Sequence, residues 1–248
     1  MKIVANLAPV VRRRLHEDVA EQLLKAIQAG DFPVGARLPS ERELSGIFTV
    51  TRPVVREALQ SLQRLGIVQI TQGERAEVVR VTPEAIVERF TDSVRTLIAT
   101  DADALDHFKE ARLAFECGVA RMAAERAAPK GLARLRQVLD EGRAAIMRRP
   151  DFVALDGEFH ATIAELTGNP LFAAVSRGIF NWLSVYHRAS VHMPGREFLT
   201  LQEHEAILNR LDGRDGEGAE TAMRRHLTRA NDLYRHAPER DGPDTTGN

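Results

Sequence analysis

Four residues in the second half of the chain are of types that bind metal ions, and their spacing could bring them together. Asp156 and His160 are four residues apart on an expected helix, so roughly 400° of rotation returns them to one face. His204 and His226 lie on the last two expected helices, which a hairpin turning through residues 211–218 could bring together. Three imidazoles and one carboxylate suit Zn²⁺, or another first-row divalent ion such as Ni²⁺ or Mn²⁺. The spacing alone also fits four ordinary core or surface residues.

Arginines near the N-terminal end of the chain suit a second kind of chemistry, the recognition of DNA. On an expected helix that runs to Leu65, one face carries Arg52, Arg56, Gln60 and Gln63. The opposite stripe is apolar and consists of Val55, Ala58, Leu59, Leu62 and Leu65. Arginine donors match guanine edges and phosphates, and glutamine can pair with adenine. A merely solvated helix face is the alternative.

The elements around this helix predict a winged helix-turn-helix. Ser40 and Glu43 form a capping box that starts a helix near Glu41, ending at about Phe48. Thr51 then caps the arginine helix, whose C-terminal stop is Gly66. An apolar helix ends upstream at residues 29–30, and strands at 67–70 and 75–80 flank a turn. In such a fold the last helix enters the major groove, and the hairpin tip at Gln72, Gly73 and Arg75 reaches the neighbouring backbone or minor groove.

This part of the chain resembles the GntR family of regulators. The resemblance rests on residues 38–44 (LPSEREL), 51–52 (TR), 55–59 (VREAL) and the glycine at 73. It implies that Arg42, Arg52 and Arg56 contact the operator, with Arg37 in support and Gly73 at the wing. The expected DNA-binding set is completed by Thr51 and Arg75. Pro53 departs from the family pattern, because many members have a hydroxyl residue there.

The second half of the chain is expected to be entirely helical. The apolar spacing predicts helices near 84–99, 103–127, 130–148, 151–167, 170–191, 197–211 and 216–236. Residues 156–160 (DGEFH), 168–170 (GNP), His204 and His226 are similar to the FCD domain of the FadR branch of GntR regulators. The resemblance implies that the aspartate and three histidines bind a metal beneath a small-molecule pocket.

A pocket for an acidic effector is expected around Arg112, in a segment similar to the Arg-x-x-x-Glu pattern of FCD domains. The arginine fork can pair with both oxygens of a carboxylate. The alternative is an intrahelical pair with Glu116, worth a few tenths of a kcal/mol. Asn181 and Tyr186 on a later helix are further pocket candidates. Among FCD regulators the chain is most similar to sialic-acid-responsive repressors, through residues 72–76, 107–108, 112–113, 115–116, 123–125, 168–172 and 182–183.

Length and composition agree with a two-domain regulator. The 248 residues are assigned to a DNA-binding domain at 1–80, a metal- and effector-binding domain at 81–237 and a disordered tail at 238–248. Residues 1–80 hold 12 Lys/Arg against 9 Asp/Glu, so the excess positive charge lies on the DNA-binding side. The single cysteine, Cys117, excludes an intrachain disulfide and suits a reducing cytoplasm. No apolar run approaches the roughly 18 residues that span a membrane.

The sequence therefore predicts a mainly α, homodimeric, cytoplasmic repressor that grips an inverted repeat in double-stranded DNA. A small carboxylate or sugar acid bound near the metal would set its operator affinity. It would do so by binding more tightly to one arrangement of the dimer's two DNA-binding domains, the reading heads, than to the other. Two other classes remain open at this stage. One is a metal-dependent hydrolase or oxygenase that uses the His/Asp site, and the other is a helical interaction module that does not bind DNA.

Overall fold

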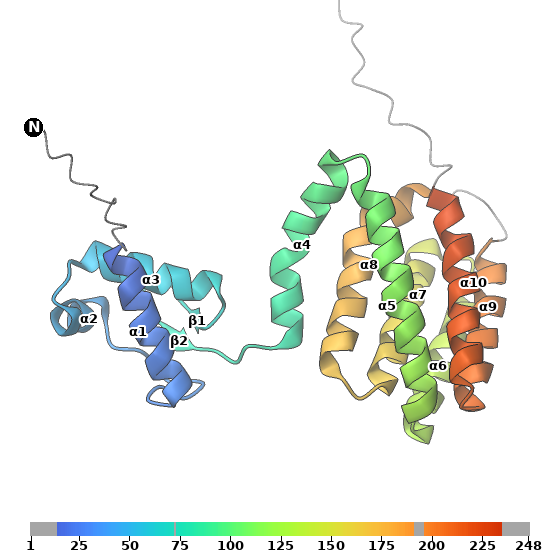
Figure 1. Ribbon diagram of the computed structural model, residues 1–248, viewed down its shortest axis with the longest axis horizontal. Coiled ribbons are helices and arrows are strands. Elements are labelled where there is room, and N and C mark those ends of the chain that lie inside the picture. The colour runs from blue at the N-terminus through green and yellow to red at the C-terminus, as the bar shows by residue number, and fades with distance from the viewer. Residues whose placement is uncertain (1–13, 72, 191–195, 235–248) are drawn as a thin grey trace, which may run out of the picture. The chain divides into compact units, whose positions relative to one another are not determined.

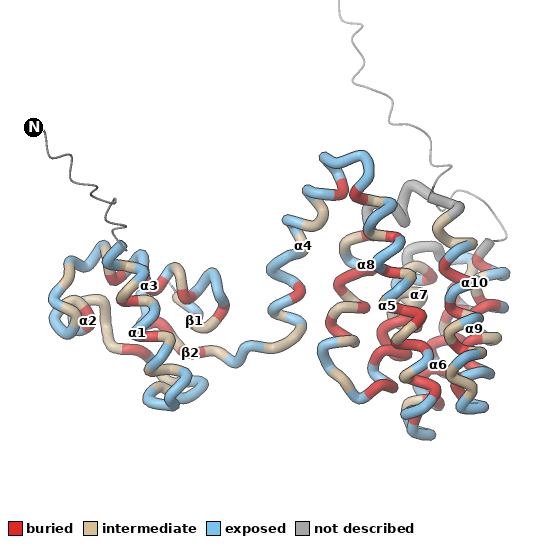
Figure 2. The backbone as a smooth tube through the Cα atoms, in the orientation of Figure 1, coloured by how far each residue is buried: buried red, intermediate tan, exposed pale blue. Residues whose placement is uncertain are grey.

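A computed structural model describes residues 14–71, 73–190 and 196–234, without the side chains of 149–150, 184–190, 196 and 232–234. The expected tail at 238–248 and the wing residue Gln72 lie outside the described residues. The described chain is mainly helical, with helices α1 to α10 and one two-stranded sheet (Figure 1). It forms two compact units, Met1–Ala85 and Ile86–Asn248, and each unit buries its own apolar residues (Figure 2).

The first unit is the predicted winged helix-turn-helix. It contains α1 (Leu15–Ala29), α2 (Glu41–Phe48), α3 (Arg52–Arg64) and the antiparallel strands β1 (Val68–Gln69) and β2 (Glu77–Val78). The strands are shorter than expected. On the edge away from β1, β2 pairs with the segment before α2, where the Leu38 N–H donates to the Ala76 carbonyl at 2.7 Å. The core beneath α3 consists of Val19, Leu23, Leu38, Leu44, Val55, Ala58, Leu59, Leu62, Val68, Ala76 and Val78.

The two helix starts that the sequence predicts are built differently. At α2 the capping box is present, because Ser40 Oγ accepts from the Glu43 N–H at 3.3 Å while the Ser40 N–H donates to the Glu43 carboxylate at 2.7 Å. Thr51 takes the N-cap position of α3, but its side chain makes no capping hydrogen bond, so the predicted cap is wrong. Pro53 lies at the second helical position and has no N–H, which removes one of the two donors that a cap hydroxyl uses.

The end of α3 also differs in one respect from the expectation. Gly66 has a φ of 66° just beyond the helix, as a C-terminal stop requires. Leu65, which the apolar stripe placed in the core, is 56% exposed. It lies after the last helical residue, where the chain leaves the direction of the stripe.

In the part of the chain that the structure describes, seven further helices follow, and their ends lie within a few residues of the predicted ones. They are α4 (Pro83–Thr100), α5 (Ala104–Arg126), α6 (Pro129–Ala145), α7 (Arg149–Leu166), α8 (Pro170–Ser190), α9 (Arg196–Asp212) and α10 (Gly216–Tyr234). α10 packs along α5 and α9, and α7 packs along α6 and α8. Gly168, with a φ of 74°, makes the turn from α7 into α8.

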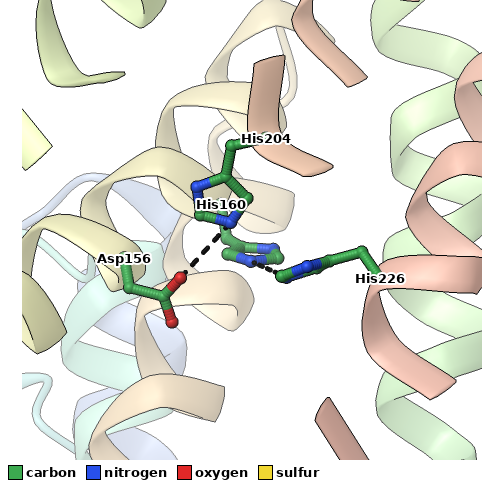
Figure 3. A group of neighbouring side chains, drawn as sticks. All are labelled: Asp156, His160, His204 and His226. Atoms are coloured by element: carbon green, nitrogen blue, oxygen red, sulfur yellow. Dashed lines mark hydrogen bonds and ion pairs between the residues drawn. The ribbon is translucent and has the colours of Figure 1, made fainter. Parts of the chain in front are cut away.

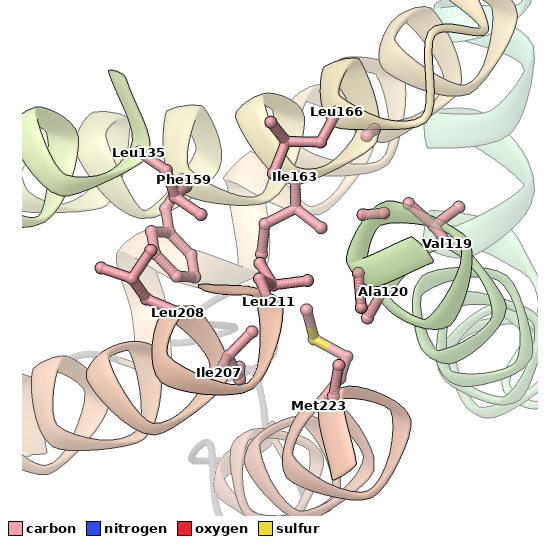
Figure 4. Packing of buried hydrophobic residues seen from close by; sticks show 14 of the residues in the cluster. Val119, Ala120, Leu135, Phe159, Ile163, Leu166, Ile207, Leu208, Leu211 and Met223 are labelled. Atoms are coloured by element: carbon pink, nitrogen blue, oxygen red, sulfur yellow. The ribbon is translucent and has the colours of Figure 1, made fainter. Parts of the chain in front are cut away.

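The core of the second unit lies between α5, α6, α7, α9 and α10 (Figure 4). Ala120, Ala123 and Ala124 of α5 are fully buried, and their small side chains leave room for α10 to approach. Phe159 and Met223 fill the space between the other helices of the core. Around this core, α7, α9 and α10 each contribute a histidine to one interior point.

Candidate metal centre and DNA-binding face

The structure gathers the four predicted metal ligands. Asp156 and His160 come from α7, His204 from α9 and His226 from α10 (Figure 3). Each offers one ligand atom, and these atoms lie within 4.8 Å of one another. The three histidines are buried and Asp156 is partly buried. The i, i+4 spacing on α7 and the hairpin between α9 and α10 together produce this convergence.

One side of the cluster leaves two buried polar atoms without hydrogen bonds. His204 Nε2 and Asp156 Oδ1 are 3.3 Å apart, yet neither has a hydrogen-bond partner. A buried polar atom left unsatisfied costs about 1–3 kcal/mol. A cation bound by both atoms would remove that cost, so this pair fits a metal ion.

The other side of the cluster brings two imidazole nitrogens face to face. His226 Nε2 and His160 Nε2 are 3.3 Å apart. Each ring turns its Nδ1 towards a carboxylate, because His226 Nδ1 lies 2.8 Å from Glu203 Oε2 and His160 Nδ1 contacts Glu116. A neutral imidazole has one N–H, and a carboxylate can only accept, so the proton belongs on Nδ1. Both Nε2 atoms then point lone pairs at one another, an arrangement that a divalent cation would stabilise.

The electrostatics of the cluster favour neutral forms of His204 and His226 and an ionised Glu116. Burial lowers the pKa of His204 well below its ordinary value, and the nearby His226 and His160 lower it further. Burial also lowers the pKa of His226. For Glu116, burial acts to raise the pKa, but the Arg112 guanidinium and His160 outweigh it and hold the pKa well below the usual range. These are the protonation states that metal binding requires.

Arg112, the predicted carboxylate clamp, is buried on α5 beside the cluster. Its Nε donates to Glu116 Oε1 at 2.6 Å, and its guanidinium lies over the Phe180 ring at 4.7 Å. The intrahelical pair is therefore present, although it lies in the interior and not on an exposed helix face. Asn181 is exposed on α8, where its backbone oxygen accepts from Arg95. The side chain of Tyr186 lies outside the described residues.

Two features of the site carry no sequence signal that would have revealed them. The first is the pairing of Glu203 with Arg229, which supports His226. The second is a small, mainly apolar cleft that reaches Asp156 and His204. Its other lining residues are Val138, Leu139, Gly142, Phe152, Leu155, Phe159 and Leu201. Both features depend on how α6, α7, α9 and α10 pack, and the helical pattern of one chain does not encode that packing.

The predicted DNA-binding residues are exposed on the first unit. They are Arg37, Arg42, Thr51, Arg52, Arg56, Gly73 and Arg75. Arg56 forms two hydrogen bonds with Glu41 of α2, at 2.9 and 2.8 Å. At the wing, Gly73 has a φ of 82° and allows the tight turn.

Arg75 at the wing and Arg37 before α2 also lie near carboxylates. Arg75 is 3.5 Å from Glu43, and Arg37 is 3.7 Å from Glu74. These pairs are largely exposed, so phosphates can displace them at little energetic cost.

Comparison with known proteins covers both units. Residues 15–78 match the family described as bacterial regulatory proteins, gntR family, and residues 108–229 match the FCD domain. A relative named HTH-type transcriptional repressor NanR, from Cronobacter sakazakii, is 37% identical over 224 residues, covering 88% of this chain and 85% of the relative. The protein of the same name from Klebsiella aerogenes is 35% identical over 230 residues, with 92% and 88% covered.

Among solved structures, the GntR protein of Streptococcus agalactiae has the same fold. It is 24% identical and has a TM-score of 0.63, and the match covers 88% of this chain and 99% of that one. In the part of the chain that the structure describes, no helix is both long and apolar enough to cross a membrane.

The family and the names of the relatives decide between the classes that the sequence left open. A GntR domain identifies a DNA-binding protein, which rules out an interaction module without DNA binding. The relatives are transcriptional repressors, so the His/Asp cluster belongs to a regulator and not to a hydrolase or oxygenase. The chain is a member of the GntR family of bacterial transcription regulators and joins its winged helix-turn-helix to an FCD domain.

Proposed function

We propose that this regulator holds a divalent metal ion in its helical unit and binds a small acidic metabolite beside it, which sets operator affinity. The observation that carries the proposal is the cluster of Asp156, His160, His204 and His226, whose ligand atoms converge in the interior and include the unsatisfied Asp156 Oδ1 and His204 Nε2. The relatives are repressors, and repression is the expected output.

Asp156 and the three histidines would hold the ion. Zn²⁺ is the expected metal, with Ni²⁺ and Mn²⁺ as alternatives, because imidazole nitrogens and one carboxylate suit all three. When bound, the ion would supply a positive centre that attracts an anionic ligand. The His204 ring stacks on Phe159 with centroids 3.9 Å apart and an angle of 7° between the planes, which fixes its orientation before any ion binds.

A carboxylate-bearing metabolite is the effector class that this environment favours. Arg112 is a buried, permanently charged guanidinium near enough to the cluster to lower the pKa of His204. Its planar fork can bind a carboxylate. We infer a sugar acid such as sialic acid, or another small carboxylate. Asn181 and Tyr186 stay candidates for the same pocket because of their positions on α8.

The effector would act on DNA binding through the spacing of two reading heads. A homodimer presents two copies of α3, which match two half-sites of an inverted repeat. The metabolite can change operator affinity only if it binds more tightly to one arrangement of the heads than to the other. Selection of bound duplexes from a random pool should therefore return an inverted repeat.

Elemental analysis tests the metal. The purified wild-type protein should carry about one equivalent of a divalent metal per chain, and the His204→Ala/His226→Ala variant should carry none. His107→Ala is the matched control, because His107 is exposed and lies outside the cluster. Equal metal content in all three proteins would place the ligands elsewhere.

Thermal unfolding tests the effector. Sialic acid, other sugar acids and small carboxylates are added singly to metal-loaded and to chelator-treated protein. A true effector raises the melting temperature by mass action, and it should also change the affinity for the selected duplex. If no acid stabilises the loaded protein, the acidic effector is wrong.

A further inference from the structure

The His226 ring is held on the side away from the cluster by a carboxylate that is itself held by arginine. His226 Nδ1 lies 2.8 Å from Glu203 Oε2. The two oxygens of Glu203 accept from Arg229 Nε at 2.8 and 2.9 Å, and Oε2 also accepts from Arg229 Nη2 at 2.6 Å. Arg229 Nη2 in addition donates to Thr200 Oγ1 at 3.0 Å. The Glu203 side chain is 7% exposed, so these contacts replace its water.

We propose that Glu203, fixed by Arg229, is a positioning residue that makes His226 present Nε2 and not Nδ1 to the metal centre. The inference deepens the proposed function, because it concerns the same centre. A neutral histidine exists as two tautomers, and a carboxylate at Nδ1 selects the one with its proton there. The Nε2 lone pair is then directed at the cluster before an ion arrives. A hydrogen bond of this kind also raises the basicity of the ligating nitrogen.

The Glu203–Arg229 pair that supports His226 joins α9 and α10. α9 contributes His204 and Glu203 from consecutive positions, so one residue enters the cluster while the next turns towards α10. α10 contributes His226 and Arg229, which lie three residues apart on one face. Because each helix supplies one ligand and one half of the support, the relative position of α9 and α10 sets the geometry of the centre.

A second, separate set of residues repeats the arrangement. His160 Nδ1 contacts Glu116, and Arg112 Nε donates to the other oxygen of Glu116 at 2.6 Å. Both members of this support come from α5 and are buried. The two rings whose Nε2 atoms face each other at 3.3 Å are thus oriented in the same way by different helices.

The test substitutes Glu203→Gln, which keeps the shape of the side chain and removes its charge. We expect the dissociation constant for Zn²⁺, measured by competition with a chromophoric chelator, to rise roughly 10- to 100-fold. Arg229→Gln should give a smaller rise in the dissociation constant, because the Glu203 carboxylate remains but loses the hydrogen bonds from Arg229 that fix it. Glu205→Gln is the control and should bind as the wild type does, since Glu205 is exposed on the same helix and pairs with Arg143.

A second readout needs no metal. In the ¹⁵N-labelled, metal-free protein, the His226 nitrogens are assigned by comparison with His226→Gln, and their shifts report the tautomer. The wild type should show the Nδ1–H form and Glu203→Gln a mixture. An unchanged tautomer together with an unchanged affinity would overturn the role of Glu203. If the wild type binds no metal, the proposed function fails, while the tautomer measurement still decides whether Glu203 positions His226.

Discussion

Arg56 of α3 and Glu41 of α2 form a two-bond fork across the helix-turn-helix, with Arg56 Nε and Nη2 at 2.9 and 2.8 Å from the two carboxylate oxygens. The fork holds the guanidinium on the face that the family resemblance assigns to the operator. Both side chains are partly exposed, so the pair contributes little to stability. The pair matters for DNA binding, because an Arg56 that contacts the operator, as the family resemblance implies, would have to exchange Glu41 for a phosphate or a guanine edge.

Arg56→Ala is therefore expected to weaken operator binding and leave folding nearly unchanged. Loss of one specific arginine contact costs about 1–3 kcal/mol of binding free energy. Titration of the selected duplex at several salt concentrations measures the effect. Lys25→Ala is the matched control, since Lys25 carries the same charge on α1 and pairs only with Glu21 in the described contacts. If the two variants bind equally well, α3 does not read the operator through Arg56.

The two helix starts of the first unit predict different costs for similar substitutions. Ser40→Ala removes a capping box that is present and should lower the free energy of unfolding of that unit by about 1 kcal/mol. Thr51→Ala removes a hydroxyl that caps nothing, so it should change stability by less than about 0.5 kcal/mol. Urea unfolding of both variants measures the difference. Equal losses would mean that Thr51 does cap α3.

Because the Arg112–Glu116 pair is buried, breaking it should cost more stability than the i, i+4 spacing alone suggests. Arg112→Ala leaves a buried carboxylate without its arginine and should cost about 3–5 kcal/mol of unfolding free energy. Arg121→Ala is the comparison, because Arg121 and Glu125 have the same spacing on the same helix, and the contacts of Arg121 with Glu125 and with Glu217 and Glu220 of α10 are largely exposed. That variant should lose at most about 0.5 kcal/mol. Denaturant unfolding of metal-free protein decides, and a mild loss for Arg112→Ala would show that Glu116 finds another partner.

Particular residues show what sequence can and cannot give in this fold. Ser40 and Glu43 act within one turn, so the start of α2 follows from local chemistry alone. Asp156 and His160 share a face by helical geometry, which needs no knowledge of other helices. Glu203 and Arg229 are brought together only by the packing of α9 on α10, and their spacing of 26 residues follows no rule.

The same limit applies to burial. The spacing of Arg112 and Glu116 is visible in the sequence. Their burial under α7 and α8, with Phe180 against the guanidinium, is not. An i, i+4 ion pair has the same sequence spacing whether it is exposed or buried, but its contribution to stability differs several-fold between an exposed and a buried position. For the Thr51 cap the sequence did contain a local counter-signal, because Pro53 at the second helical position offers no N–H and leaves only one of the two usual donors.

Cys117 provides a prediction about pH and reactivity. Burial raises the pKa of its thiol to about 11, and Arg224 only partly opposes the shift. The thiolate is the reactive form, so at pH 8 the native protein should resist iodoacetamide and gain one adduct only after unfolding. Because the pKa is higher in the folded state, the thiol adds stability below its unfolded value of about 8.5, and this contribution is lost as the pH rises towards 11. Intact mass measured over time, with and without urea, checks the labelling. Native labelling at pH 8 as fast as in urea would mean that α5 and α10 open readily around Cys117.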